Sequence, residues 1–450
     1  FLGKMYVDYM LILTFPTLLF ILGVSLEVAY LLKNRTLAIS VLLGLFILLY
    51  FMTIDAVWGA IDPWGRTLPL LFSDVTGMVH PERIILQRST FLFLGCGGIV
   101  LMVGMSNRLM KVGGILCLCL GIVSGGIYYR DFRKINSKRS EYRQVFEKYA
   151  SIKGGHIKSH TIYFCQEKSR IMAKSDLVVE NVGTQPLTRL LLYLNPALQI
   201  VTLLENTEDE LPYTREKQAL LLEKTLLPGE EVHLHIAYEG NIDEAICFLD
   251  LTDVEYHDTR LNDCQHIPHS IFRHGGSYSC VGDNYTLLFP ECLWYPVCVP
   301  PVNVKEPLAR CYDFTHYLLK VGNVGERMVI SQGEVEVSGD TTLFKNQEAL
   351  PALCLSIGFY EKRSVVLDSL TLELYHFPGH DFFMRDYTNL SDSAEFLLRE
   401  PVSVVREMND GEYPFHKFVL VESPVNFIPY QRKGVVGSEF VQPEMLFYPE

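Results

Sequence analysis

The densest group of possible metal ligands in this sequence is the stretch DCQHIPHSIFRHGGSYSC. Its candidate ligands are Cys264, His266, His269, His274 and Cys280. Thiolate and imidazole groups are the ligands that zinc prefers, and four of these side chains would complete a tetrahedral site. The spacing matches neither a paired CxxC nor an HxxxH pattern. A polar loop with buried or disulfide-bonded cysteines is therefore the competing interpretation.

Sequence motifs of the common catalytic sites do not occur in the 450 residues. No histidine is followed by glutamate, so these residues contain no HExxH zinc helix. A GxxxxGK[ST] phosphate-binding loop and a GxSxG nucleophile turn are also missing. We therefore predict no complete catalytic constellation, and no metal site apart from the cysteine and histidine cluster. The last fifteen residues, VGSEFVQPEMLFYPE, place glutamates in an apolar run, which is typical of a strand at an active site.

Four apolar stretches near the start of the sequence predict helices that cross a membrane. They cover residues 9–32, 36–54, 89–106 and 112–129. Each stretch has about the 20 residues that a hydrocarbon core of roughly 30 Å requires, and Glu27 is the only charged residue among them. We therefore expect an α-helical transmembrane bundle over residues 1–130. Because the chain begins with Phe1 rather than Met, we also expect further residues upstream.

The short loops between the predicted spans carry basic residues, which indicate the orientation of the bundle. These residues are Lys33, Arg35, Arg108 and Lys111. By the positive-inside rule the loops are cytoplasmic, so the region after the fourth span lies outside the cytoplasm. The basic segment 131–158 argues for the opposite orientation. It is either a juxtamembrane helix against lipid headgroups or a solvated connector.

The hydrophobic pattern changes to a period of two after this connector. Short alternating runs separated by turn residues predict a large antiparallel β domain over residues 159–366. A helical pattern returns at 391–408, so we predict that residues 367–450 begin an α+β domain. The formal net charge of −13 and the lack of a basic stripe after the connector exclude nucleic acid as an expected partner.

The β-rich half resembles the N-terminal, saddle-like domain of the M1 family of zinc aminopeptidases. The landmarks that carry the resemblance follow one another in the family's order. They are RLLLYLNPALQIVTL (189–203), LLPGEEVHLHIAYEG (226–240), LWYPVCVPP (293–301) at the family's FPCFDEP turn, RMVISQGEVEVSGDTTLFKNQEALPALCLSIGFYE (327–361) at its SNG turn, and SAEFLLREPVSVVREMNDGEYPFHKFVLVESPVNF (393–427) at the start of its catalytic domain.

The N-terminal half extends this resemblance. Apolar spans, the segment TLPLLFSDVTGM (67–78), further spans and a basic stretch are similar to bacterial fusions of an ABC-2 type permease with an M1 peptidase. This resemblance implies a protein of the bacterial inner membrane that lies in the lipid bilayer. An ABC-type ATPase subunit is then an expected partner, because no nucleotide-binding motif is present in the chain.

The M1 resemblance implies a zinc peptidase that removes N-terminal residues, with zinc bound by an HExxH helix that would follow residue 450. It also implies a peptide substrate, which docks on the family's GxMEN strand as an added strand. The motif's Glu and Asn, counted back from Tyr448 and Glu450, correspond to Val441 and Gln442. Glu439 or Glu444 would replace the motif's Glu only after a change of register. A membrane-anchored β domain that binds peptides or partners in an export complex without hydrolysing them is the alternative.

Overall fold

The computed structural model describes thirteen ranges of the chain. They are residues 7, 9–52, 59–66, 68, 72–152, 154–206, 209–257, 277–306, 312–367, 370–381, 413, 415–427 and 441–450. The chain forms two compact units. Unit 1 contains residues 1–138 and 251–276, and unit 2 contains residues 139–250 and 277–450. The boundary differs from the predicted bundle of residues 1–130, since the first unit includes eight more residues and a separate later segment.

Unit 1 is mainly helical. Its elements are η1 (Met10–Thr14), α2 (Phe15–Leu32), α3 (Arg35–Met52), β1 (Phe72–Ser73), β2 (Gly77–Met78), α4 (Pro81–Val103), the first part of α5 (Arg108–Tyr149) and α6 (Asp253–His257). Among the described residues, three helical segments are long and apolar enough to cross a membrane, namely Met10–Leu32, Pro81–Val103 and Arg108–Tyr149, while α3 is shorter. The apolar helices are therefore compatible with a membrane by length and composition.

Helices α2 and α4 pack with their backbones in close approach. A Cβ atom at Gly23 would lie 2.6 Å from the carbonyl oxygen of Gly95, so neither position accepts a larger residue without displacement. The N-terminal half of α4 also carries Arg88, which is buried. Its guanidinium donates to the carbonyl oxygens of Asp62 at 2.9 Å and Pro63 at 3.0 Å. This arginine thereby holds the segment before α4. Together with Glu82, Arg83 and Gln87, it explains why the apolar pattern begins only at residue 89 although the helix begins at Pro81.

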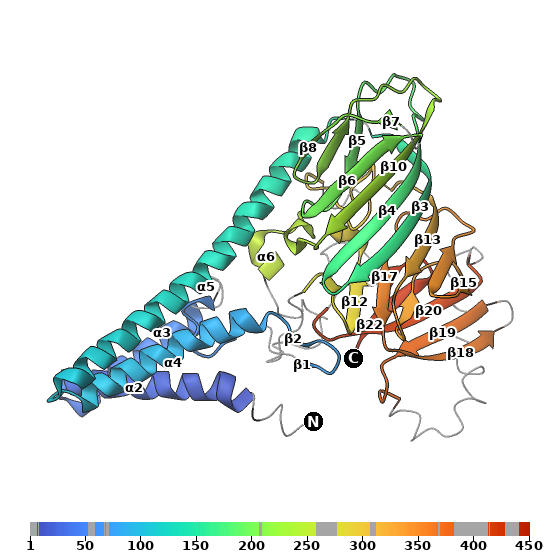
Figure 1. Cartoon of the computed structure of the whole chain (residues 1–450). Coiled ribbons are helices and arrows are strands. Elements are labelled where there is room, and N and C mark those ends of the chain that lie inside the picture. The colour runs from blue at the N-terminus through green and yellow to red at the C-terminus, as the bar shows by residue number, and fades with distance from the viewer. Residues whose placement is uncertain are drawn as a thin grey trace. The chain divides into compact units, whose positions relative to one another are not determined.

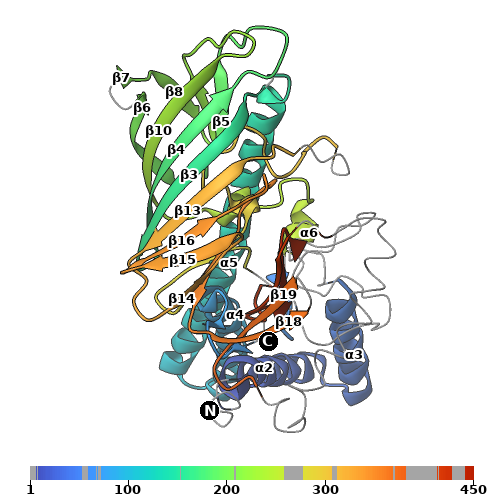
Figure 2. The ribbon, with the colours of Figure 1, turned by 90° about the vertical axis from the view of Figure 1, so that its right-hand side faces the viewer.

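Unit 2 is built around an eight-stranded sheet with the order β15-β16-β13-β3-β4-β10-β6-β7. Figures 1 and 2 show its long strands β3, β4, β10 and β13 side by side. The strands are β3 (His156–Glu167), β4 (Arg170–Glu180), β6 (Leu198–Glu205), β7 (Asp209–Glu210), β10 (Glu231–Gly240), β13 (His316–Gly322), β15 (Glu334–Ser338) and β16 (Thr341–Lys345). All neighbours are antiparallel except β13 and β3, which run parallel, so the β domain is not purely antiparallel as predicted.

Two smaller sheets complete the β domain. One has three strands, β5 (Leu190–Tyr193), β9 (Ala219–Leu222) and β8 (Tyr213–Glu216), in that order. The other has four strands, β11 (Cys280–Val281), β12 (Tyr285–Leu288), β17 (Leu355–Gly358) and β14 (Met328–Ile330). Short 3-10 helices, η3 (Glu244–Ile246) and η4 (Pro290–Cys292), lie between strands. Trp294 and Tyr295, which follow η4, are buried in the core.

A five-stranded mixed sheet ends the described chain. Its order is β18-β19-β20-β22-β21, with β18 (Glu361–Leu367), β19 (Leu370–His376), β20 (Lys417–Ser423), β22 (Met445–Pro449) and β21 (Val441–Gln442). The predicted boundary between residues 366 and 367 falls inside the β18–β19 hairpin, because β18 pairs with β19 in this sheet. The predicted helix at 391–408 lies outside the described residues.

Helix α5 is a single helix of 42 residues, about 63 Å long at 1.5 Å per residue. It includes the fourth predicted span and most of the predicted connector. Within unit 2, Arg139 is fully buried, and its guanidinium donates to the carbonyl oxygens of Cys247 at 2.7 Å and Phe248 at 2.9 Å. Arg143 donates to the carbonyl oxygen of Leu249 at 2.8 Å. These two basic residues of the connector therefore fix a backbone segment inside unit 2.

Candidate functional site

Strand β21 is one terminal strand of the five-stranded sheet in its described strand order. It pairs antiparallel with β22, with Val441 opposite Leu446 and Gln442 opposite Met445. Strands β19, β20 and β22 run parallel to one another, and the two terminal strands of the described order, β18 and β21, each run antiparallel to their neighbour. The two positions that the M1 resemblance assigns to peptide docking thus form a terminal antiparallel strand. Glu439 lies outside the described residues.

Glu444 occupies the turn between β21 and β22, with a positive φ of 60°. Its carboxylate oxygen Oε2 accepts a hydrogen bond of 2.7 Å from the backbone N–H of Gly333 and lies 3.9 Å from the Lys417 Nζ. Lys417 in turn donates to the carbonyl oxygen of Gly333. The two side chains hold one glycine from both of its backbone groups, and we call this arrangement the Gly333 clamp.

Burial shifts both ionisable groups of the clamp. It lowers the pKa of the Lys417 ammonium, and the nearby Glu444 carboxylate opposes that change. Burial also raises the pKa of the Glu444 carboxyl, against the hydrogen bond from Gly333 and the charge of Lys417. Each shift disfavours the charged form. The contacts within the Gly333 clamp therefore offset only part of the free-energy cost of removing the two charged groups from water.

Gly333 is the residue that permits this geometry. Its φ of 100° lies in a region that residues with a side chain rarely adopt, and an added Cβ would lie 2.6 Å from the carbonyl oxygen of Lys345. The glycine lies in the run 327–361, which the M1 resemblance matched to the family's SNG turn and the strand pair after it. The sequence therefore pointed to this turn but not to its partners, Lys417 and Glu444.

A polar cavity of about 200 Å³ adjoins the Gly333 clamp. Its wall includes the clamp residues together with Asn346, Glu334, Glu348 and other residues of the β16 and β20 ends. Asn346 is buried, and neither its amide nitrogen nor its amide oxygen has a hydrogen-bond partner among the described residues. Sequence reasoning missed Asn346 and Lys417, because an asparagine after a strand and a lysine at the start of one carry no motif.

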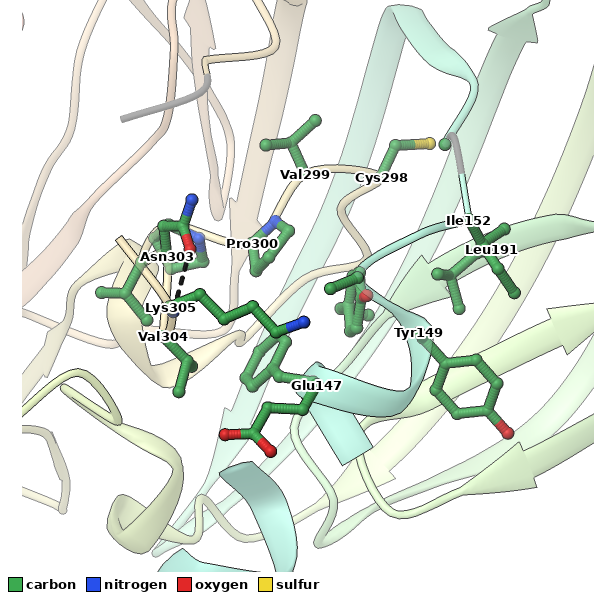
Figure 3. Close-up of a pocket in the computed structure, with 16 residues that line it drawn as sticks. Glu147, Tyr149, Ile152, Leu191, Cys298, Val299, Pro300, Asn303, Val304 and Lys305 are labelled. Atoms are coloured by element: carbon green, nitrogen blue, oxygen red, sulfur yellow. Dashed lines mark hydrogen bonds between the residues drawn. The ribbon is translucent and has the colours of Figure 1, made fainter. Parts of the chain in front are cut away.

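A second cavity of about 250 Å³ lies where the chain leaves α5. Figure 3 shows its wall, formed by Glu147, Tyr149 and Ile152 on one side and by the loop from Cys298 to Lys305 on the other. The loop is held by a hydrogen bond of 3.0 Å from the Lys305 N–H to the Asn303 side chain. Valine and proline side chains dominate this loop, and Glu147 and Lys305 are exposed. The cavity suits a small apolar group and brings together no acid–base pair.

Of the predicted zinc ligands, only Cys280 lies within the described residues. Its thiol donates to the carbonyl oxygen of Tyr285 at 3.5 Å, and burial raises its pKa to about 12. The other four candidates, Cys264, His266, His269 and His274, lie outside the described ranges. Within those ranges no group of three His, Cys, Asp or Glu side chains is placed to hold a metal ion.

Of the two histidines in HFPGH (376–380), His380 has its partner on β20. Glu422 is buried, and its carboxylate accepts hydrogen bonds from the backbone N–H of Phe377 at 2.5 Å and pairs with His380 Nδ1 at 2.7 Å. His376 is also buried, with its Nδ1 3.0 Å from the carbonyl oxygen of Phe377. These contacts fix the turn after β19 to β20 and bring the histidines to no common ligand site.

Comparisons with known proteins find likeness to solved structures only. No protein-family model matches the chain, and no curated protein matches it. One similar structure is an M1 zinc metallopeptidase from Deinococcus radiodurans, with 15% identity, a TM-score of 0.43, and coverage of 61% of this chain and 58% of that chain. Another is aminopeptidase A from Legionella pneumophila, with 12% identity, a TM-score of 0.41, and coverage of 62% and 30%. The chain thus spans less than two thirds of either structure, and at these values the likeness assigns no function.

Proposed function

We propose that the chain is a membrane-anchored, M1-like peptidase region that binds peptides along strand β21. The observation that carries the proposal is the position of Val441 and Gln442. The M1 resemblance assigns these two residues to the peptide-docking strand. They form a strand that pairs antiparallel with β22 and is terminal among the described strands of its sheet. A peptide added to such a strand gains main-chain hydrogen bonds that do not depend on its sequence.

The side chains at these positions limit what the strand can select. A glutamate at the motif position would bind the free amine of a substrate, but Val441 carries no charge and Gln442 only an amide. Glu444 binds Gly333 and lies near Lys417, so its carboxylate serves the turn after the strand. We therefore expect peptide binding with little preference for a free N-terminus.

Peptide binding along β21 is tested with the full-length protein in detergent and fluorescent short peptides of mixed sequence. Methylation of alternate peptide nitrogens removes the N–H groups that pair with a strand edge. We expect these N-methylated peptides to bind at least about tenfold more weakly, since hydrogen bonds of roughly 1 kcal/mol each are lost. Methylation of the other set of nitrogens is the matched control. Equal binding of the unmodified and both methylated forms would contradict strand addition.

Hydrolysis is a separate part of the proposal, because the described residues hold no metal-ligand group and the 450 residues contain no HExxH. A protein that supplies this helix would bind zinc and activate water with it. The test is release of coumarin from aminoacyl-coumarin by the full-length protein with and without a chelator. Chelator-sensitive release supports the peptidase.

A non-enzymatic peptide-binding domain in an export complex is the second candidate. The uncharged Val441 at the motif's Glu position favours it, since that replacement removes the amine-binding group of an aminopeptidase. Peptide binding without chelator-sensitive hydrolysis in the full-length protein would favour this candidate over the first.

The resemblance of the apolar half to ABC-2 permeases adds a proposed transport role in the bacterial inner membrane. Transport would need an ATPase subunit as partner. Affinity purification of the full-length protein from native membranes tests this, and we expect an ATPase to copurify. Repeated purification without one would favour helices that only anchor the chain.

A further inference from the structure

The polar cavity beside the Gly333 clamp combines three groups whose hydrogen-bonding capacity is only partly used. We propose that it binds a free amino acid with a basic side chain. The inference does not rest on peptide binding along β21, because neither Val441 nor Gln442 lines this cavity.

The first group is the Asn346 amide, which is buried and has no hydrogen-bond partner among the described residues. A buried amide without partners costs free energy, and the cost is recovered when a ligand supplies both an acceptor and a donor. Because an amide donates and accepts, Asn346 suits a ligand that contains both kinds of group. Amino acids meet this requirement through their carboxylate and ammonium groups.

The second and third groups are the charges of the clamp. Lys417 has three N–H donors, and its one hydrogen bond among the described residues goes to the Gly333 carbonyl oxygen. Glu444 binds Gly333 through Oε2, which leaves Oε1 as a further acceptor. The Lys417 nitrogen and the Glu444 oxygen are 3.9 Å apart. A zwitterion has opposite charges at a similar separation, so its carboxylate can meet Lys417 while its ammonium meets Glu444.

The volume of the cavity and the charges of its wall restrict the class of ligand further. A cavity of about 200 Å³ is smaller than the roughly 300–1,000 Å³ of sites for drug-sized ligands, which fits a single amino acid. The same wall carries two exposed carboxylates, those of Glu334 and Glu348. It carries one exposed ammonium group, that of Lys345. Glu373 also lines the cavity, but it already pairs with Lys362 at 2.6 Å. The remaining excess of negative charge favours a lysine or arginine side chain over an acidic one.

Calorimetric titration of the full-length protein in detergent with arginine tests the proposal. We expect saturable binding that is about tenfold or more weaker for N-acetyl-arginine, which lacks the ammonium charge, and for agmatine, which lacks the carboxylate. Glutamate should bind more weakly than arginine. These comparisons use the unaltered protein, so they decide the question even if a substitution prevents folding.

Substitutions then locate the site. Asn346→Leu has a similar volume without the amide, and Lys417→Met removes the ammonium; each should weaken arginine binding about tenfold or more. Lys158→Met removes an exposed lysine of β3 and should leave the affinity unchanged. Absence of saturation up to about 10 mM arginine, or equal affinity of Asn346→Leu and the unaltered protein, would overturn the proposal. Peptide binding along β21 should survive Asn346→Leu, so failure of either proposal can be recognised separately.

Discussion

His160 is a buried histidine of β3 whose ring cannot reach water. Its Nε2 lies 2.8 Å from the Ser175 hydroxyl, which is 3.2 Å from the hydroxyl of Tyr238. Burial lowers the pKa of His160 to about 3. Both His160 and Ser175 are buried, so their hydrogen bond contributes to packing within the β domain.

This histidine predicts loss of stability in acid. An unfolded histidine has a pKa of about 6.5, so below that pH the unfolded state binds a proton that the folded state does not. Stability is then lost as the pH falls from about 6.5 towards 3. We expect the melting temperature of the full-length protein to fall more steeply with acidification than that of His160→Gln. His233→Gln, at an exposed position of β10, is the control, and equal slopes for the unaltered protein and His160→Gln would contradict the assignment.

Gly333 gives a second prediction at this scale. Gly333→Ala should lower the free energy of unfolding by about 1–3 kcal/mol, because of the backbone strain and the contact with the Lys345 carbonyl oxygen. Gly339 also has a positive φ, of 59°, but an added Cβ there meets no atom within 4 Å. Gly339→Ala is therefore the matched control for strain alone. The melting temperatures of the two variants are compared. An equal decrease in melting temperature would show that the contact with the Lys345 carbonyl oxygen adds no cost at Gly333.

Individual site residues were only partly predictable from sequence. The resemblance placed Val441 and Gln442 on a docking strand, a role that stays a prediction, and among the described strands of the sheet β21 is terminal. It offered Glu444 as a binding residue, a role that stays a prediction, although its carboxylate is engaged by Gly333. Asn346 and Lys417 could not be predicted, because neither belongs to a motif and the groups that meet Lys417, Gly333 and Glu444, lie far from it in the sequence.

At the scale of elements, the C-terminal half of α5 is held by its arginines. Arg139→Met should lower the free energy of unfolding by about 3 kcal/mol or more, since it leaves buried carbonyl oxygens, including those of Cys247 and Phe248, without their donor. Lys148→Met removes an exposed ion pair with Glu216 and should lower the free energy of unfolding far less, because solvent weakens exposed ion pairs. Thermal unfolding of the full-length protein measures both. Similar losses of unfolding free energy in the two variants would mean that the hydrogen bonds of Arg139 to buried carbonyl oxygens add no stability beyond that of an exposed charge.

The strands were the more predictable elements. Alternation of buried and exposed residues is visible in β10, whose buried positions include Val232, Leu234 and Ile236. The parallel pairing of β13 with β3 was not predictable, because a hydrophobic period defines a strand face but not its neighbour. The continuity of α5 was also left open, since the basic residues that suggested a connector bind backbone carbonyls through tertiary contacts.

At the scale of the whole molecule, the apolar helices are compatible with a membrane and the large sheets form a separate unit. The short basic loops predict that the C-terminal region lies outside the cytoplasm. In spheroplasts that express the full-length protein, an added protease should therefore digest this region while a cytoplasmic marker stays intact. Protection until the membrane is lysed would reverse the orientation.

Peptide binding along β21 is the central claim, and hydrogen–deuterium exchange tests it most directly. The full-length protein is compared with and without a saturating short peptide. An added strand would pair with backbone groups of β21, so we predict slower exchange at residues 441–442. Strand β18 is the other terminal strand in the described order of this sheet and should exchange at an unchanged rate. Unchanged exchange at β21, or equal protection at β18, would contradict the account.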